Sequence, residues 1–149
     1  MSIFPAKIVL AIDGSEEAGL AAEAATELSR DTGSEVVVTY VLPTPEELIG
    51  HHFYSSEIRE SILEQARSEA RKFLEQRVEQ LRSEGAKVVD THLRIGEPDK
   101  EIIRLSEEIG ATLIVMGSRG LGTVRRALMG SVSDSVVRHA HCPVLIMRH

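Results

Sequence analysis

The sequence has little of what stabilises small secreted proteins or holds a chain in a membrane. A single cysteine, Cys142, excludes an intramolecular disulfide and is typical of a reducing compartment. No apolar run approaches the ~20 residues that span a bilayer. The first residues, MSIFPAKIVLAIDG, lack the basic region and long apolar stretch of a signal peptide. These absences predict a cytoplasmic protein without a membrane segment.

Aromatic residues and positive charge are also scarce. Tryptophan is absent and aromatic residues make up 3% of the chain, so valine, isoleucine, leucine and alanine must build the core. A net charge of −6 disfavours a surface for nucleic acid or anionic lipid. The 149 residues, 42% of them hydrophobic, fit one globular domain spanning residues 1–149.

Short apolar runs alternate with segments of helical periodicity along the whole chain. The runs predict strands at residues 7–12, 35–41, 86–93, 113–116 and 143–147. The periodic segments predict helices at residues 15–30, 56–84, 98–109 and 131–139. Strands separated by helices imply an α/β fold with a parallel sheet and helices on both of its faces. The alternation alone does not determine the strand order.

The stretch TLIVMGSRGLGTVRRALMGSVS contains four glycines after its apolar run. Its pattern predicts a strand, then a loop, then the start of a helix. Glycine lets the backbone approach a ligand closely. The first N–H groups of a helix have no partner within it and attract anions such as phosphate. Arg119, Arg125 and Arg126 add positive charge to the same loop.

Each part of this loop also has a purely structural interpretation. Gly117 is explained equally by the end of a strand, and Ser131 with Asp134 by a capping box. Neither the Walker A pattern nor G-x-G-x-x-G is present. Similarly, Asp13 follows a buried strand, where open α/β sheets bind ligands, but Asp13-Gly14 is also ordinary turn chemistry.

The longest segment without predicted regular structure is residues 42–55, which contains Pro43 and Pro45. It leaves the same sheet edge as Asp13, and the lid of a site or a surface loop would both explain it. It carries His51-His52, and a second histidine group, His139-x-His141-Cys142, lies near the C-terminus. His51-His52 has no nearby cysteine or carboxylate at the usual spacing of a zinc site. The second group straddles a helix end and a strand start before proline, which favours a structural linker, so no dedicated metal site is expected.

The glycine spacing resembles that of one known family. Gly117, Gly120 and Gly130-Ser131 read G-x2-G-x9-G-[ST], which is similar to the ATP-binding signature of the universal stress proteins. The resemblance extends to KIVLAIDGSE near the start, VVVTYVLP, IVMGSRG and the final HCPVLIM. It implies a Rossmann-like fold, related to the adenine nucleotide alpha-hydrolases, with five parallel strands in the order 3-2-1-4-5. In that order the first and fourth strands are neighbours, and Asp13 and the glycine loop border one crevice.

The resemblance also implies a binding site for ATP carried with Mg²⁺. The backbone of the glycine loop and the hydroxyls of two serines would bind the phosphates, and Asp13 would contact a ribose hydroxyl or the Mg²⁺. Val41 would read the adenine, and Ala11 stands where the family often has proline. The residues expected to bind the nucleotide are Ala11, Ile12, Asp13, Val41, Met116, Gly117, Arg119, Gly120, Gly130, Ser131, Val132 and Ser133.

No Walker lysine and no pairing of a nucleophile with a base is evident in the sequence, so any ATP hydrolysis should be slow. We therefore expect a nucleotide-dependent regulatory module of the stress response, and the resemblance implies a homodimer through residues 143–147. Two alternatives stay open at this stage. One is an enzyme that cleaves a nucleotide phosphate, and the other is a dimeric interaction scaffold without a ligand.

Overall fold

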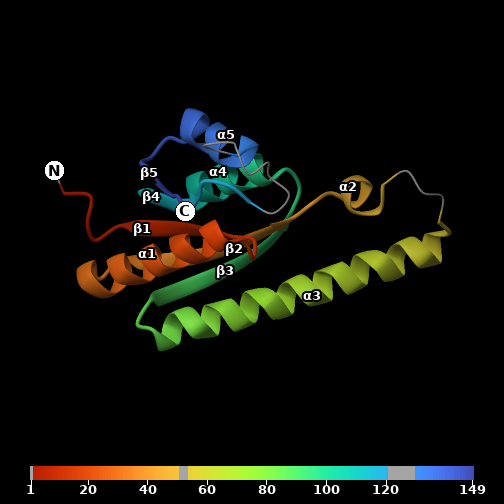
Figure 1. Ribbon diagram of the computed structural model, residues 1–149, viewed down its shortest axis with the longest axis horizontal. Coiled ribbons are helices and arrows are strands. Elements are labelled where there is room, and N and C mark those ends of the chain that lie inside the picture. The colour runs from red at the N-terminus through yellow and green to blue at the C-terminus, as the bar shows by residue number, and fades with distance from the viewer. Residues whose placement is uncertain (1, 51–53, 121–129) are drawn as a thin grey trace.

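The computed structural model describes residues 2–50, 54–120 and 130–149. Strands and helices alternate along the chain, as Figure 1 shows. Their bounds are β1 Lys7–Ile12, α1 Glu16–Thr32, β2 Glu35–Leu42, α2 Pro45–Ile49, α3 Ser56–Ser83, β3 Lys87–Ile95, α4 Pro98–Ile109, β4 Leu113–Gly117, α5 Ser131–His139 and β5 Val144–Met147. Apart from α2, every element was predicted, with its ends shifted by at most two residues.

The strands form one parallel sheet of five in the order β3-β2-β1-β4-β5. This confirms the predicted α/β class and strand order. In the centre of the sheet, Val9 of β1 lies between Val37 of β2 and Ile114 of β4. β1 and β4 are therefore neighbours, although about a hundred residues separate them in the chain.

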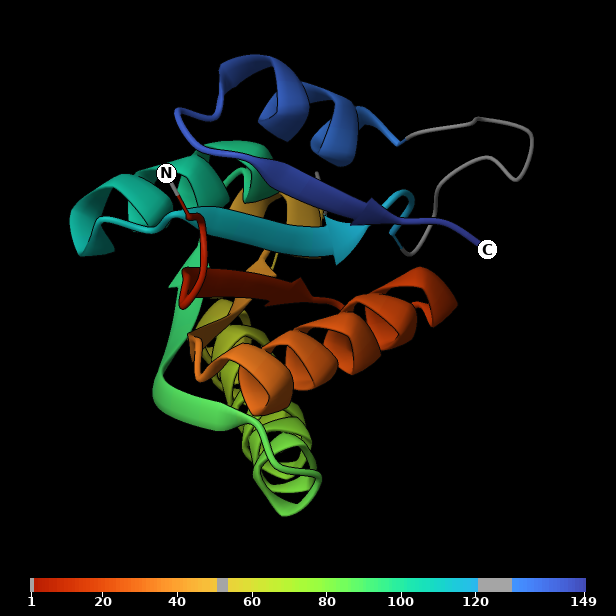
Figure 2. The same cartoon turned by 90° about the vertical axis from the view of Figure 1, so that its left-hand side faces the viewer.

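Helices cover both faces of the sheet and create two apolar layers (Figure 2). On one face, Ile8 and Leu10 of β1 pack with residues of α1 and α3. On the other face, Val9 of the same strand packs with residues of α4 and α5. Because the strands are buried on both sides, apolar residues occupy successive positions in these runs and do not alternate with polar residues. The core is aliphatic, as the composition predicted.

Only the C-terminal half of α3 belongs to this core. Its buried residues are Ala70, Leu74, Val78 and Leu81, whereas Ile58, on the predicted apolar stripe, is 49% exposed. Figure 1 shows the N-terminal half of the helix extending past the sheet, beside α2. A helix of 28 residues is about 42 Å long, which exceeds the length of the strands that it covers.

β3 lies at the edge of the sheet, as its polar pattern predicted. Its pairing with β2 shifts between Val36 and Val37, which leaves Val89 without a register partner in a bulge. On either side of the bulge, side chains form hydrogen bonds with backbone groups of the strand. Arg82 donates to the Val88 carbonyl at 3.1 Å, and Asp90 accepts from the Thr91 N–H at 2.9 Å. A bulge and charged side chains of this kind discourage pairing with another chain.

The prediction that residues 42–55 lack regular structure is wrong in part, because α2 forms within them. Thr44 caps this helix by accepting a hydrogen bond from the Glu47 N–H at 3.3 Å, and Pro45 occupies its first turn. A threonine cap followed by proline is a helix-start signal, so Pro45 begins a helix here. Among the helices that the structure describes, none is long and apolar enough to cross a membrane.

Buried hydroxyls connect the strands at the amino-terminal edge of the sheet. The Ser34 side chain, which is fully buried, accepts a hydrogen bond from the Ala6 N–H at 2.7 Å. Ser29 donates to the Ser34 carbonyl at 2.6 Å and accepts from the Lys87 N–H at 2.8 Å. Backbone groups at the starts of three strands are therefore satisfied by two serine side chains.

Candidate functional site

A cleft of about 560 Å³ opens at the carboxyl edge of the sheet, above β1 and β4. Every residue that the sequence predicted for the site lines it. The lining consists of Ala11, Ile12, Asp13, Ser15, Ala18, Thr39, Tyr40, Val41, Pro43, Pro98, Ile102, Met116, Gly117, Ser118, Arg119, Gly120, Gly130, Ser131, Val132 and Ser133. Its volume is within the range of small-molecule sites, about 300–1,000 Å³.

The topology of the sheet explains the position of the cleft. After β1 the chain turns to α1 on one face of the sheet, and after β4 it continues to α5 on the other face. The two connections diverge, so a crevice opens between neighbouring strands at this switch point. The N-terminal ends of α1, α4 and α5 border the crevice through Ser15, Pro98 and Ser131. Their dipoles make its potential favourable for an anion.

Asp13 serves both as a turn residue and as part of the cleft wall. One carboxylate oxygen, Oδ1, accepts a hydrogen bond from the Ser15 N–H at 2.9 Å. Ser15 in turn caps α1 by accepting from the Ala18 N–H at 3.1 Å. The second oxygen, Oδ2, points toward Gly120 across the cleft. The two interpretations of Asp13 that the sequence left open are therefore compatible.

The glycines Gly117 and Gly120 are required by close approaches of different kinds. A Cβ on Gly117 would lie 2.7 Å from the backbone carbon of Glu17, so β4 could not end against α1 with a larger residue. A Cβ on Gly120 would overlap Asp13 Oδ2. Gly117 is therefore explained by packing of the backbone, whereas Gly120 leaves space for the carboxylate in the cleft.

The peptide unit of Ser118 holds the two described ends of the glycine loop together. Its carbonyl accepts hydrogen bonds from the Gly130 N–H at 2.6 Å and from the Ser133 hydroxyl at 2.5 Å. Its N–H donates to the Met147 carbonyl of β5 at 2.8 Å. Ser118 and Ser133 are each 2% exposed. The Ser133 hydroxyl thus donates its hydrogen to the protein backbone, and its predicted contact with phosphate stays a prediction.

The first turn of α5 has no side-chain cap. Gly130 is the N-cap residue, and Ser131 is the first residue of the helix. The alternative capping box does not form: the Asp134 carboxylate pairs with Arg138 at 2.9 Å. Within the part of the chain that the structure describes, no side chain caps the Ser131 and Val132 N–H groups, which are thus left for a ligand or water. This observation favours the anion-site interpretation over the structural one.

Arg119 lines the cleft in an ion pair with Glu17 of α1. The distance from Nη2 to Oε1 is 3.0 Å, and the two side chains are 21% and 11% exposed. A hydrogen bond from the backbone of Glu17 and the Arg119 side chain hold the pKa of Glu17 below its usual range, although burial opposes the shift. Because Glu17 partly neutralises Arg119, the predicted contact of Arg119 with phosphate stays a prediction. Arg125 and Arg126 lie outside the described residues.

The opposite end of the cleft is apolar and includes residues that the sequence analysis missed. Pro98 and Ile102 come from α4, beside the predicted Val41 and Met116. Tyr40 also lines the cleft, and its ring packs edge-on against a phenylalanine of α3 at 5.4 Å. Burial and the nearby Asp13 carboxylate raise the pKa of Tyr40. Since α4 follows a parallel strand, its first turn must lie at the same edge of the sheet, and this signal would have identified Pro98.

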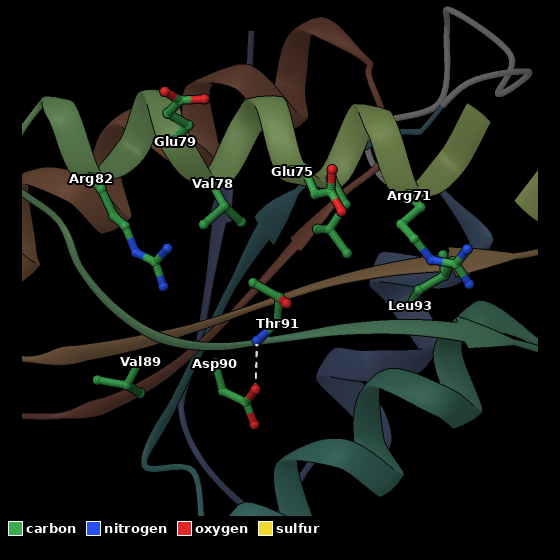
Figure 3. A pocket seen from close by; sticks show the side chains of 10 residues that line it. Arg71, Glu75, Val78, Glu79, Arg82, Val89, Asp90, Thr91 and Leu93 are labelled. Carbon is green, nitrogen blue, oxygen red and sulfur yellow. Dashed lines mark hydrogen bonds between the residues drawn. The ribbon is translucent and has the colours of Figure 1, made fainter. Parts of the chain in front are cut away.

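A second hollow, of about 710 Å³, lies between α3 and the edge strand β3 (Figure 3). Leu74, Val78 and Leu93 give it an apolar floor, while charges of both signs surround it, including Glu75 and Arg71. No predicted site residue borders it and no helix N-terminus points into it. The predicted site therefore does not extend into this hollow.

The ring of His139, in the second histidine group, has a partner within its own helix. His139 Nδ1 lies 2.9 Å from the Ser135 carbonyl, within its own helix. Within residues 2–50, 54–120 and 130–149, no group of three or more histidine, cysteine or acidic residues is placed to hold a metal ion. His51-His52 lies outside those ranges.

This arrangement defines a class of protein, the doubly wound α/β proteins with a cleft at the switch point of the sheet. A comparison with families of known proteins is more specific. The model of the universal stress protein family matches residues 6–148. The chain therefore belongs to the universal stress protein family.

Individual relatives agree with this assignment. Universal stress protein YxiE from Bacillus subtilis is 33% identical over 146 residues, which cover 95% of this chain and 98% of that protein. The solved structure of hypothetical protein MJ0577 is similar with a TM-score of 0.82 and 27% identity, over 96% of this chain and 95% of that one. A universal stress protein from Archaeoglobus fulgidus in complex with dAMP is 28% identical, with a TM-score of 0.65 and coverage of 95% and 96%.

Proposed function

We propose that the cleft binds ATP together with Mg²⁺ and that the protein acts as a nucleotide-dependent regulatory module in a stress response. The observation that carries this proposal is the first turn of α5, which faces the cleft without a side-chain cap. The apolar end of the cleft suits a purine, and the uncapped end suits phosphates. A solved relative that is a complex with dAMP supports an adenine nucleotide.

Each end of the cleft has a distinct role in this proposal. The N–H groups of Ser131 and Val132 bind phosphate oxygens, and the exposed Ser131 hydroxyl adds a donor. Ala11, Val41 and Met116 enclose the base. The Asp13 carboxylate contacts a ribose hydroxyl or the Mg²⁺ that the nucleotide carries. Mg²⁺ would supply charge neutralisation, because the one cationic side chain among the described lining residues, Arg119, is already paired with Glu17.

We propose that hydrolysis of the bound nucleotide is slow. Histidine, cysteine and lysine are absent from the described lining of the cleft, and its one carboxylate among the described residues, Asp13, is assigned to the ribose or the Mg²⁺ and not to the activation of water. Binding and release of the nucleotide, and not its turnover, would then be the signal. A turnover well above one per minute in clean protein would favour the alternative of a phosphohydrolase.

The test begins with freshly purified protein that has received no nucleotide. The protein is denatured, the small molecules are separated and any nucleotide is identified by mass. We expect ATP at close to one per chain, whereas ADP alone would indicate turnover. The variant Gly120→Glu should lose the nucleotide, because its side chain must occupy the space beside Asp13. Undiminished ATP affinity in Gly120→Glu would refute the site.

We also propose that the protein is a homodimer that pairs through β5. This strand is the other edge of the sheet, and its residues Val144 to Met147 are apolar and only half-buried. An unpaired apolar edge is prone to association. Light scattering at micromolar concentration should give the mass of a dimer, and Ile146→Lys should shift it to that of a monomer. A monomer mass for the unmodified protein would contradict this proposal.

We propose a cytoplasmic location as well. The basis is the single cysteine, which is half-buried and free, and which suits a reducing compartment. Burial raises the pKa of the Cys142 thiol, so little of it is thiolate and reactive at neutral pH. Cell fractionation tests this location, and recovery of the protein outside the cytoplasm would refute it.

A further inference from the structure

We infer that Ser133 is a positioning residue of the cleft, whose hydroxyl holds the start of α5 against the end of β4 and does not bind phosphate. The inference rests on the proposed nucleotide site and assigns to Ser133 a role that differs from the one its sequence position suggests. Its basis is the pair of hydrogen bonds accepted by one buried carbonyl, that of Ser118.

The hydrogen-bond inventory of the Ser133 hydroxyl leaves nothing for an anion. A serine hydroxyl has a single hydrogen to donate. Ser133 Oγ lies 2.5 Å from the Ser118 carbonyl oxygen and 3.1 Å from the Gly130 carbonyl oxygen, and both of these groups are acceptors. A phosphate oxygen is also an acceptor at neutral pH. Ser133 would have to abandon a buried carbonyl, at a cost, to bind it.

The hydrogen bonds from Ser133 and Gly130 to the Ser118 carbonyl are called the clamp below, and the position of Gly130 explains why the clamp is needed. Gly130 is the N-cap of α5, and glycine has neither a side chain for capping nor a restricted backbone. The Gly130 N–H donates to the Ser118 carbonyl at 2.6 Å, the same oxygen that Ser133 binds. The Ser118 N–H is anchored in turn to the Met147 carbonyl. The two bonds to the Ser118 carbonyl therefore fix the start of α5 and leave the N–H groups of Ser131 and Val132 unoccupied by a capping side chain.

The functional consequence is convergence of those N–H groups. The N–H groups of Ser131 and Val132 bind one anion well only if the first turn keeps a single orientation relative to the loop. Loss of the clamp would let Gly130 sample other conformations, so the donors at Ser131 and Val132 would spend less time aimed at the cleft. The effect on affinity would arise from this disorder, although Ser133 itself never touches the ligand.

The experiment compares Ser133→Ala with a matched control on the same helix. Ser135→Ala also removes a side-chain hydrogen bond, the one of 2.7 Å to Asp99, but outside the cleft. The first measurement uses the protein stripped of nucleotide and follows the hydrogen exchange of the Gly130 amide by NMR. We expect Ser133→Ala to accelerate this exchange about tenfold, and Ser135→Ala to leave it unchanged.

The second measurement is titration with ATP and Mg²⁺ by calorimetry. Ser133→Ala should weaken binding about tenfold, Ser133→Thr should keep affinity within about threefold because it retains the hydroxyl, and Ser135→Ala should match the unmodified protein. Unchanged exchange at Gly130 together with weaker binding would make Ser133 a direct ligand and overturn the inference. Faster exchange with unchanged affinity would overturn it equally.

The failure of this inference is distinguishable from failure of the proposed function. An unmodified protein that binds no adenine nucleotide refutes the proposed function before any variant is made. The exchange measurement on the stripped protein needs no nucleotide, and it tests the clamp itself. Thermal denaturation of each variant confirms that it is folded at the temperature of the titration.

Discussion

Replacing Gly120 by alanine tests whether the glycine loop and Asp13 form one site. The added Cβ would overlap Asp13 Oδ2, and the next nearest atom, Asp13 Cγ, would lie 3.7 Å away. The φ of Gly120 is outside the left-handed region, so alanine causes no backbone strain there. Asp13 cannot simply turn aside, because Oδ1 holds the Ser15 N–H at 2.9 Å. The substitution therefore acts on the position of one carboxylate.

The expected magnitude follows from what that carboxylate does in the proposed site. A hydrogen bond to a charged group contributes about 1.5–3 kcal/mol, so its loss should weaken the binding of ATP with Mg²⁺ by about 10- to 100-fold. Calorimetric titration measures this directly. As a control, Gly19→Ala in α1 has no atom within 4 Å of the new Cβ. Affinity should not change, and stability should rise by about 0.5–1 kcal/mol because Gly19 lies inside a helix.

A double-mutant cycle with Asp13→Ala shows whether the loss of ATP affinity in Gly120→Ala depends on the Asp13 carboxylate. Once the carboxylate is gone, the Cβ at position 120 meets no oxygen, and Gly120→Ala should cost less than about 0.5 kcal/mol of binding. An equal loss in both backgrounds would refute the reasoning, because Gly120 would then act on the ligand independently of Asp13.

Two further predictions concern stability. Ser34→Ala leaves the Ala6 N–H buried without its partner, so chemical denaturation should show that the free energy of unfolding falls by about 1–3 kcal/mol. The control Ser83→Ala, at an exposed residue, should lower it by less than about 0.5 kcal/mol. A similar loss in both variants would contradict the role of the buried Ser34 hydrogen bond. Arg94 donates to Glu108 at 2.5 Å and thereby holds the pKa of Glu108 below its usual 4.5. This ion pair stabilises the fold above that pH, and the contribution is lost as the pH falls through the lowered value. The stability difference between the unmodified protein and Arg94→Met should therefore shrink from pH 7 to pH 3, and a difference that does not depend on pH would exclude the ion pair as its cause.

The fold was largely readable from the sequence because its signals are local and agree with one another. After Lys7, the run KIVLAI is apolar at every position, which is typical of a short strand buried on both faces. The exception is α2, because Pro43 and Pro45 together predict an interruption of regular structure. Pro45 occupies the first turn of a helix, the one helical position in which proline costs nothing, and the Thr44 cap before it was the signal that should have decided.

The lining of the cleft was predictable as a set of residues, but the hydrogen bonds of those residues were not. Their joint presence in one cleft follows from the strand order, which the family resemblance supplied. The sequence could not show that the Ser133 hydroxyl is engaged by Ser118, since that bond depends on how the helix start meets the strand end. Nor could it show that Arg119 pairs with Glu17, which lies about a hundred residues earlier in the chain.

The sequence by itself determined the class of fold, the aliphatic core and the spacing of the glycine loop, because apolar periodicity and glycine positions act through local backbone preferences. Tertiary structure alone decided which polar groups are available to a ligand. Ser131 and Ser133 are two residues apart and chemically identical, yet one hydroxyl is exposed and the other is buried against a carbonyl. The physical reason is that a hydrogen bond is satisfied or left open only by what lies opposite it in space, and segments distant in the chain supply that partner.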